Sequence, residues 1–206
     1  MGKKIPKYRL LRSRIITDLE NGLDKSLTYH GVHHTLDVCN ACNAYIRRMS
    51  LNPKQRLLLR TAALMHDYGF IISYKNHEEI GCKIAREKLP DYNYSKKDIE
   101  EICAMIMATK IPQSPKNTLS KILCDADLDY LGRDDFKNIG DTLFQELKNY
   151  KVLSSREEWN KIQFQFLSKH EYKTEYGRKY RQPKKQKHIQ KLKKWLNKNV
   201  PTFLEA

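Results

Sequence analysis

Apolar residues recur at the spacing of an α-helix along almost the whole chain, whereas the strict alternation that is typical of β-strands is scarce. Residues 52–70 show the pattern clearly. Asn52 is a favoured N-cap, Pro53 suits the first helical turn, and Gly69 is expected to end the helix. Ser95 and Pro112 bound another such segment as its cap and its stop. The sequence therefore predicts an all-α fold.

Nine helical segments are expected in total, and neither an internal repeat nor a low-complexity linker separates them. We therefore expect one domain over residues 1–206, with a core at about 28–132 and a basic helical extension at about 155–200. The expected helices cover residues 9–23, 34–50, 52–70, 76–89, 95–110, 115–131, 133–150, 154–180 and 183–199.

The composition excludes several classes of protein. Hydrophobic residues make up 40% of the 206 residues, which is enough for a packed core. No stretch approaches the roughly 18 apolar residues of a membrane span, and the first residues lack the apolar part of a secretory signal. The five cysteines all lie in expected helices, so we interpret them as buried hydrophobic residues of a reducing compartment. These features predict a cytoplasmic protein without a membrane partner.

The net charge of +15 is concentrated near the C-terminal end, because residues 171–200 alone carry +9. Tyrosines 172, 176 and 180 and Trp195 are interspersed with the basic residues, a pattern typical of contact with single-stranded nucleic acid. An amphipathic helix docked on a bundle gives the same pattern, with its lysines in solvent. Both interpretations stay open, and the apolar positions at helical spacing are Ile189, Leu192, Trp195 and Leu196.

Four residues point to a metal site. His34 lies at the start of one expected helix, His66 and Asp67 lie near the end of another, and Asp127 lies in a third. The apolar residues before His66 should be buried, so this helix carries the His-Asp pair to the edge of a core. A buried carboxylate is costly unless it is paired or bound to a cation. Two histidines and two aspartates form a mixed nitrogen and oxygen set that suits a divalent transition metal.

The order His, His-Asp, Asp over residues 28–132 resembles the HD-domain superfamily of metal-dependent phosphohydrolases, which are all-α. The resemblance implies that His34, His66, Asp67 and Asp127 bind the metal. We place the last ligand at Asp127 rather than Asp125, because the family's aspartate usually follows a small residue and precedes an apolar one. The metal itself, whether Mn²⁺, Mg²⁺, Zn²⁺, Co²⁺ or iron, stays open, as does the number of ions.

A narrower resemblance concerns residues 29–38, "YHGVHHTLDV", which are similar to the YHNxxHAxDV motif of class I cyclic-nucleotide phosphodiesterases. Gly31 and Thr35 depart from that motif. The resemblance implies that His30 is a general acid that protonates the leaving oxygen, while His34 binds metal. His33 falls at a variable position and is expected to be solvated or to lie behind the ligands.

Three further residues are candidates for substrate binding. His77 is either a site residue or a helix cap, and no other histidine occurs between it and His170, which argues against the di-iron HD oxygenases and the HD-GYP enzymes. Lys110 and Arg133 flank segments that carry site residues, and either could clamp a phosphate. As ordinary solvated cations they would have no such role.

Taken with the resemblance, these residues predict a phosphohydrolase that uses metal-activated water on a nucleotide phosphodiester or phosphomonoester. Asp67 is then both a ligand and a catalytic residue. The alternative is an HD module that senses a nucleotide or binds nucleic acid through its basic C-terminal segment, with little turnover. The oligomeric state is left open.

Overall fold

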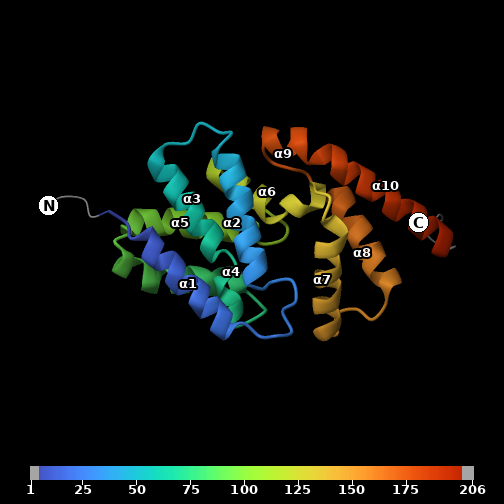
Figure 1. Cartoon of the computed structure of the whole chain (residues 1–206), viewed down its shortest axis with the longest axis horizontal. Coiled ribbons are helices and arrows are strands. Elements are labelled where there is room, and N and C mark those ends of the chain that lie inside the picture. Colours follow the sequence, from blue (N-terminus) through green and yellow to red (C-terminus); the bar gives the residue numbers. More distant parts are fainter. Residues whose placement is uncertain (1–4, 201–206) are drawn as a thin grey trace. The chain divides into compact units, whose positions relative to one another are not determined.

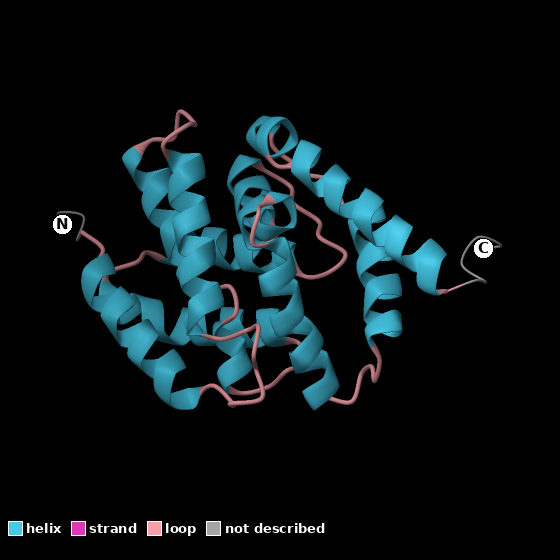
Figure 2. Ribbon diagram, turned by 45° about the vertical axis from the view of Figure 1, so that its right-hand side comes forward, coloured by secondary structure: helices cyan, strands magenta, loops and turns pink. Residues whose placement is uncertain are grey.

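The computed structural model of the chain describes residues 5–200 and consists of helices joined by loops and turns (Figures 1 and 2). Ten α-helices and three short 3-10 helices, labelled η1–η3, are present, and no strand occurs among the described residues. The predicted all-α fold is confirmed. None of the described helices is both long enough and apolar enough to cross a membrane.

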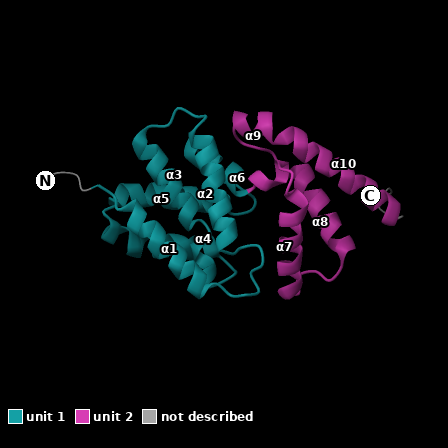
Figure 3. Cartoon of the chain, viewed as in Figure 1, with its two compact units in different colours: residues 1–127 teal, residues 128–206 magenta. Residues whose placement is uncertain are grey.

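The chain divides into two compact units, Met1–Asp127 and Leu128–Ala206 (Figure 3). This division does not decide whether residues 1–206 form one domain, so the single domain stays a prediction. The first unit contains α1 (Tyr8–Gly22), α2 (Val32–Ile46), α3 (Pro53–Met65), η1 (Tyr68–Ile71), α4 (His77–Lys88), η2 (Leu89–Tyr92), α5 (Lys96–Thr109) and α6 (Thr118–Asp127). The second contains η3 (Asp129–Gly132), α7 (Phe136–Asn149), α8 (Arg156–Lys169), α9 (Glu175–Tyr180) and α10 (Gln182–Asn199).

Helices α2, α3, α5 and α6 pack against one another and form the centre of the first unit (Figure 1). Two of them begin at capping boxes that the sequence indicates. The Asn52 side chain accepts from the Gln55 amide at 2.9 Å, and Ser95 accepts from the Asp98 amide at 3.2 Å. All five cysteines are buried thiols, as expected.

Helix α3 ends at Met65, four residues before the predicted end at Gly69. His66 and Asp67 form the turn that follows, and the chain then enters η1. Gly69 lies against the start of α4, where a Cβ atom would overlap the carbonyl oxygen of His77. Gly69 is therefore a close-approach residue and not a helix cap.

Two other predicted helices are interrupted. Residues 115–131 form α6 and η3, which are separated at Leu128. Residues 154–180 form α8 and α9, with a break after Lys169. Thr174 caps the new helix, since its hydroxyl accepts from the Gly177 amide at 3.0 Å.

In the second unit, α10 packs against α8, α9 and η3. Leu196 is fully buried and Trp195 is partly buried, so the apolar stripe of the basic helix faces its own unit. Lys187, Lys193, Lys194 and Lys198 are exposed. This geometry fits the interpretation of α10 as a docked helix with a solvated lysine face.

Candidate metal centre

The ends of three helices bring together four side chains in the first unit. His34 lies in the first turn of α2, His66 and Asp67 follow α3, and Asp127 is the last residue of α6. His34, His66 and Asp67 are at most 6% exposed. The early end of α3 matters here, because the turn at Asp67 lets consecutive side chains reach the same point.

Donor atoms of the two aspartates lie close to the ring nitrogens of the two histidines. The Nε2 atoms of His34 and His66 lie 3.2 Å apart. Asp67 Oδ2 lies 3.3 Å from His34 Nε2 and 3.1 Å from His66 Nε2. Asp127 Oδ1 lies 3.2 Å and 3.5 Å from the same two nitrogens. Ligands about 2.1 Å from one ion are separated by about 3.0 Å along an octahedral edge and about 3.4 Å along a tetrahedral edge. Among the described residues, the ligand atoms of His34, His66 and Asp127 all lie within 4.8 Å of one another, a spacing that fits a single transition-metal ion, and Asp67 lies beside them in contact with both histidines.

Two further observations support this fit. Asp67 Oδ2 is buried and accepts no hydrogen bond from the described residues, although two ring nitrogens lie close to it. A buried carboxylate oxygen without a donor is rare unless an ion completes its surroundings. The ring of His66 is held by Nδ1, which donates to the Ala63 carbonyl oxygen at 2.9 Å, so Nε2 is directed at the cluster.

The charged groups of the cluster shift one another's pKa values. Burial by itself would lower the pKa of His34, but the carboxylates of Asp127 and Asp67 outweigh it and raise the pKa to about 9. In the same way, Asp67 and Asp127 raise the pKa of His66 well above its usual range against the effect of burial. Burial would raise the pKa of Asp127, yet the two imidazoles lower it to about 2. Without a cation the site therefore holds protons, and an ion must displace them.

His30 and His77 lie beside the cluster, and the rings of both contact Phe70. The His30 ring stacks on Phe70 at 4.3 Å between centroids, and the His77 ring stacks on the same residue at 4.0 Å. His77 Nε2 lies 3.5 Å from Asp67 Oδ1 and 3.3 Å from Glu78 Oε1. His77 thus contacts the carboxylate oxygen that does not enter the cluster, whereas His33 is exposed.

Phe70 is the residue that sequence reasoning missed. It is 5% exposed and fixes both flanking imidazoles. Its position three residues after Asp67 in a predicted helix gave no signal, because only the 3-10 turn of η1 aims it between His30 and His77.

The two predicted cationic clamps are ion-paired elsewhere. Lys110 pairs with Glu79 of α4 and makes no hydrogen bond or ion pair with the four-residue cluster. Arg133 belongs to the second unit, where it makes two hydrogen bonds to Asp135, at 3.0 Å and 2.8 Å, and lies 3.6 Å from Asp129. Neither is a free cation in the described part of the chain, so a phosphate would have to displace a carboxylate.

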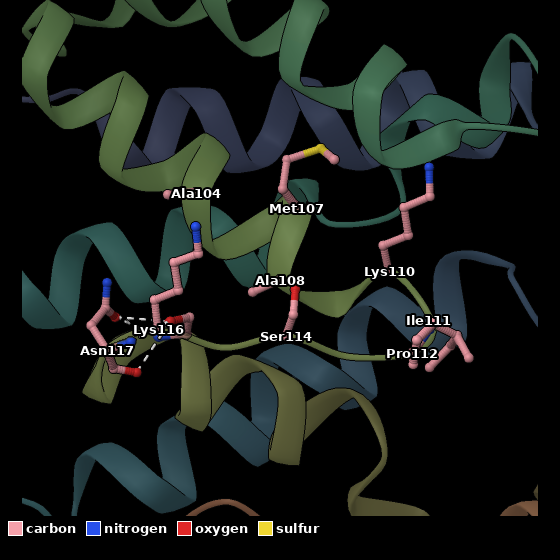
Figure 4. Close-up of a pocket in the computed structure, with 10 residues that line it drawn as sticks. Ala104, Met107, Ala108, Lys110, Ile111, Pro112, Ser114, Lys116 and Asn117 are labelled. Atoms are coloured by element: carbon pink, nitrogen blue, oxygen red, sulfur yellow. Dashed lines mark hydrogen bonds between the residues drawn. The ribbon is translucent and has the colours of Figure 1, made fainter.

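A hollow of about 490 Å³ lies between the end of α5 and the start of α6 (Figure 4). Lys110, Ser114, Lys116 and Asn117 line part of it, but no member of the metal cluster does. The Lys110 ammonium points away from Ser114 in this view. The hollow and the cluster are therefore separate features of the first unit.

Comparison with known proteins agrees with this fold. Residues 31–129 match the family model of the HD domain. A crystal structure described as a predicted HD superfamily hydrolase from an uncultured Thermotogales bacterium is similar in fold, with a TM-score of 0.54 and 20% sequence identity. The match covers 72% of this chain and 88% of that chain. None of the curated proteins compared matches this sequence. Residues 31–129 therefore form an HD domain.

Proposed function

We propose that the chain is a metal-dependent phosphohydrolase that acts on a nucleotide phosphodiester or phosphomonoester. The observation that carries the proposal is the cluster of His34, His66, Asp67 and Asp127, with its buried Asp67 oxygen that accepts no hydrogen bond from the described residues. A divalent ion bound there supplies a Lewis acid and lowers the pKa of water at the site.

The residues around the cluster have distinct proposed roles. Asp67 directs Oδ2 into the cluster while Oδ1 faces His77, so His77 orients this carboxylate and also borders the substrate. His30 is held against Phe70, where its ring lies outside the ligand positions and donates a proton to the leaving oxygen. We retain Lys110 and Arg133 as proposed phosphate contacts, each after exchange of its carboxylate partner.

The alternative is an HD module that binds a nucleotide or nucleic acid with little turnover. The complete ligand set favours the enzyme, because a binding module has no chemical need to gather two histidines and two aspartates at one point. The two functions differ in one measurable respect, which is the release of product.

A substrate panel tests the proposal. Cyclic nucleotides, linear dinucleotides, nucleoside mono- and triphosphates and single-stranded oligonucleotides are incubated with the chain and Mn²⁺, Mg²⁺, Co²⁺, Zn²⁺ or Fe²⁺. We expect hydrolysis of at least one nucleotide class with at least one ion. Binding without product release throughout the panel would support the alternative.

The Asp67→Asn variant links activity to the cluster. It should lose bound metal by elemental analysis and lose turnover while its helical circular dichroism is retained, because the amide supplies a weaker ligand of the same shape. Asp91→Asn, the same substitution at an exposed position, should change neither. Metal content and activity that persist in a folded Asp67→Asn protein would refute the ligand assignment.

A further inference from the structure

Residues of α7, α8 and α10 line a hollow of about 500 Å³. These three helices belong to the second unit (Figure 3). Its volume falls within the range of small-molecule sites, roughly 300–1,000 Å³. Every lining residue belongs to the second unit, and none takes part in the metal cluster. The hollow therefore needs an explanation of its own.

Two buried amides line this hollow. Asn160 is 8% exposed and Gln163 is 7% exposed, and both project from α8, one helical turn apart. Neither side-chain amide makes a hydrogen bond with the described residues, and neither is fully enclosed, so both are reached from the hollow. Two unpaired amides suit a ligand that offers both donors and acceptors.

Aromatic rings form the rest of the wall. Trp159 and Trp195, the two tryptophans of the chain, both line the hollow. His188 stacks on Phe136 at 4.4 Å between centroids, and its Nε2 donates to the Arg133 carbonyl oxygen at 2.8 Å. The other ring nitrogen of His188 is therefore an acceptor when the imidazole is neutral. Such walls favour a flat heterocycle.

The charge beside the hollow is positive. Helix α10 contains seven lysines and no acidic residue. Lys191 lines the hollow, is exposed, and makes no hydrogen bond or ion pair with the described residues. The other two lining cations, Lys137 and Arg156, share the carboxylate of Asp141. An anionic group at the mouth would therefore meet Lys191, whose charge otherwise acts on Asp134, a lining carboxylate that is already paired with Lys184.

We propose that this hollow is a second ligand site and that it binds a nucleotide. The base stacks among the aromatic rings and pairs through its edge with Asn160 and Gln163, and the phosphate contacts Lys191. The nucleotide is either free or part of a single strand, since both present the same base and phosphate. The site goes beyond the proposed hydrolysis, because it requires none of the metal ligands.

The fluorescence of the two lining tryptophans can report nucleotide binding to the hollow. The full chain is titrated with AMP, GMP, CMP and UMP in the presence of a chelator, and tryptophan fluorescence is followed, with calorimetry as a second readout. We expect a saturable response to at least one nucleotide and none to ribose 5-phosphate, which lacks the base. A single-stranded hexanucleotide that binds more tightly than the mononucleotides identifies the strand as the source. Weaker binding of the hexanucleotide identifies the free nucleotide.

Variants of similar shape test whether the amides of Asn160 and Gln163 contact the base. Gln163→Met and Asn160→Leu keep side-chain volume and remove the amide, so each should raise Kd by about three- to tenfold. Gln145→Met makes the same exchange on the exposed side of α7 and should leave Kd unchanged.

Two more variants test whether Lys191 contacts the phosphate and whether binding is independent of the metal cluster. Lys191→Gln changes an exposed position, so folding is not at risk. It should weaken the binding of nucleotides but not the binding of nucleosides. Asp127→Asn should leave binding intact, because it alters only the metal cluster. The proposal is overturned if no nucleotide or oligonucleotide gives a saturable response, if Lys191→Gln has no effect on nucleotide binding, or if Asp127→Asn abolishes binding.

Discussion

Two histidines and two aspartates meet in one cluster. The aspartates raise the pKa values of the histidines, and the histidines lower the pKa of Asp127. The folded pKa of His34, about 9, lies above its ordinary value of 6.5, so its contribution to stability is complete below about pH 6.5 and is lost as the pH rises through 9. The folded pKa of Asp127, about 2, lies below 3.8, so its contribution is present above about pH 3.8 and is lost as the pH falls through 2.

We therefore predict that the chelated protein loses stability between about pH 6.5 and 9, by on the order of 3 kcal/mol for His34 alone. Metal affinity should rise over the same interval, because the ligands must release protons before they bind. Urea unfolding in chelator and metal titration at the same pH values measure the two trends. Stability that stays flat or rises across this interval would contradict the ion pairing.

The second prediction at this scale concerns His30. His30→Ala should keep its metal but slow turnover by about 10²–10⁴-fold on esters with alkoxide leaving groups. Nitrophenyl esters should slow far less, since their leaving group needs little protonation. His33→Ala is the control, because His33 is an exposed neighbour. Equal slowing on both ester types would mean that His30 positions the substrate, and loss of metal would make it a ligand.

The sequence predicted which residues gather at the cluster, because each lies near the end of a strongly periodic segment. It did not predict how His30 and His77 are held. Their common neighbour, Phe70, depends on a 3-10 turn whose geometry is set by tertiary packing.

At the level of elements, Gly69 and Gly81 face each other where η1 meets α4. A Cβ at Gly69 would overlap the backbone of His77, whereas a Cβ at Gly81 has its nearest neighbours at 3.6 Å, an ordinary separation. Gly69→Ala should therefore destabilise the protein by about 1–3 kcal/mol and weaken metal binding, because η1 must move away from α4.

Gly81→Ala is the matched control for this interface. It adds the same methyl group within helix α4, where alanine is preferred, so stability should stay equal or rise by about 0.5–1 kcal/mol. Urea unfolding of both variants measures the difference. If Gly69→Ala is as stable as Gly81→Ala, the close approach does not hold η1 in place.

Helix starts were predictable and helix ends were less so. Asn52 and Ser95 cap through their own side chains, and such local chemistry is visible in sequence. The ends of α3 and α8 depend instead on how the following chain packs. Gly69 resembles a helix terminator in sequence, yet its role is to let α4 come close.

For the whole molecule, the largest share of the net charge of +15 lies near the C-terminal end, where α10 alone contains seven lysines and no acidic residue. Truncation beyond Pro183 would also remove Leu196, which is fully buried, so substitution of lysines is the cleaner test. Replacing four exposed lysines of α10 by glutamine, with Lys191 of the hollow kept, should lower the salt dependence of oligonucleotide binding. The slope should fall by about 0.7 for each phosphate that is no longer neutralised, and metal content should not change. The four residues are Lys187, Lys193, Lys194 and Lys198.

The control removes the same charge from the first unit, at Lys83, Lys96, Lys97 and Lys121, which are all exposed. If both fourfold variants lower the slope equally, only net charge matters and α10 is not the binding surface. The positive segment was evident from sequence. The hollow with Asn160 and Gln163 was not, because it arises only when three helices meet.

The placement of the cluster at helix ends has a consequence for how much the chain can vary in length. Asp127 follows Asp67 by 60 residues, and this closed loop contains α4, α5 and most of α6. Because the entropy of closing a loop grows only with the logarithm of its length, ten extra residues in a surface turn would cost about 0.1 kcal/mol. Insertions between η2 and α5 are thus tolerated as long as α5 and α6 keep their packing. The cluster depends on the directions of three helices and hardly at all on the amount of chain between them.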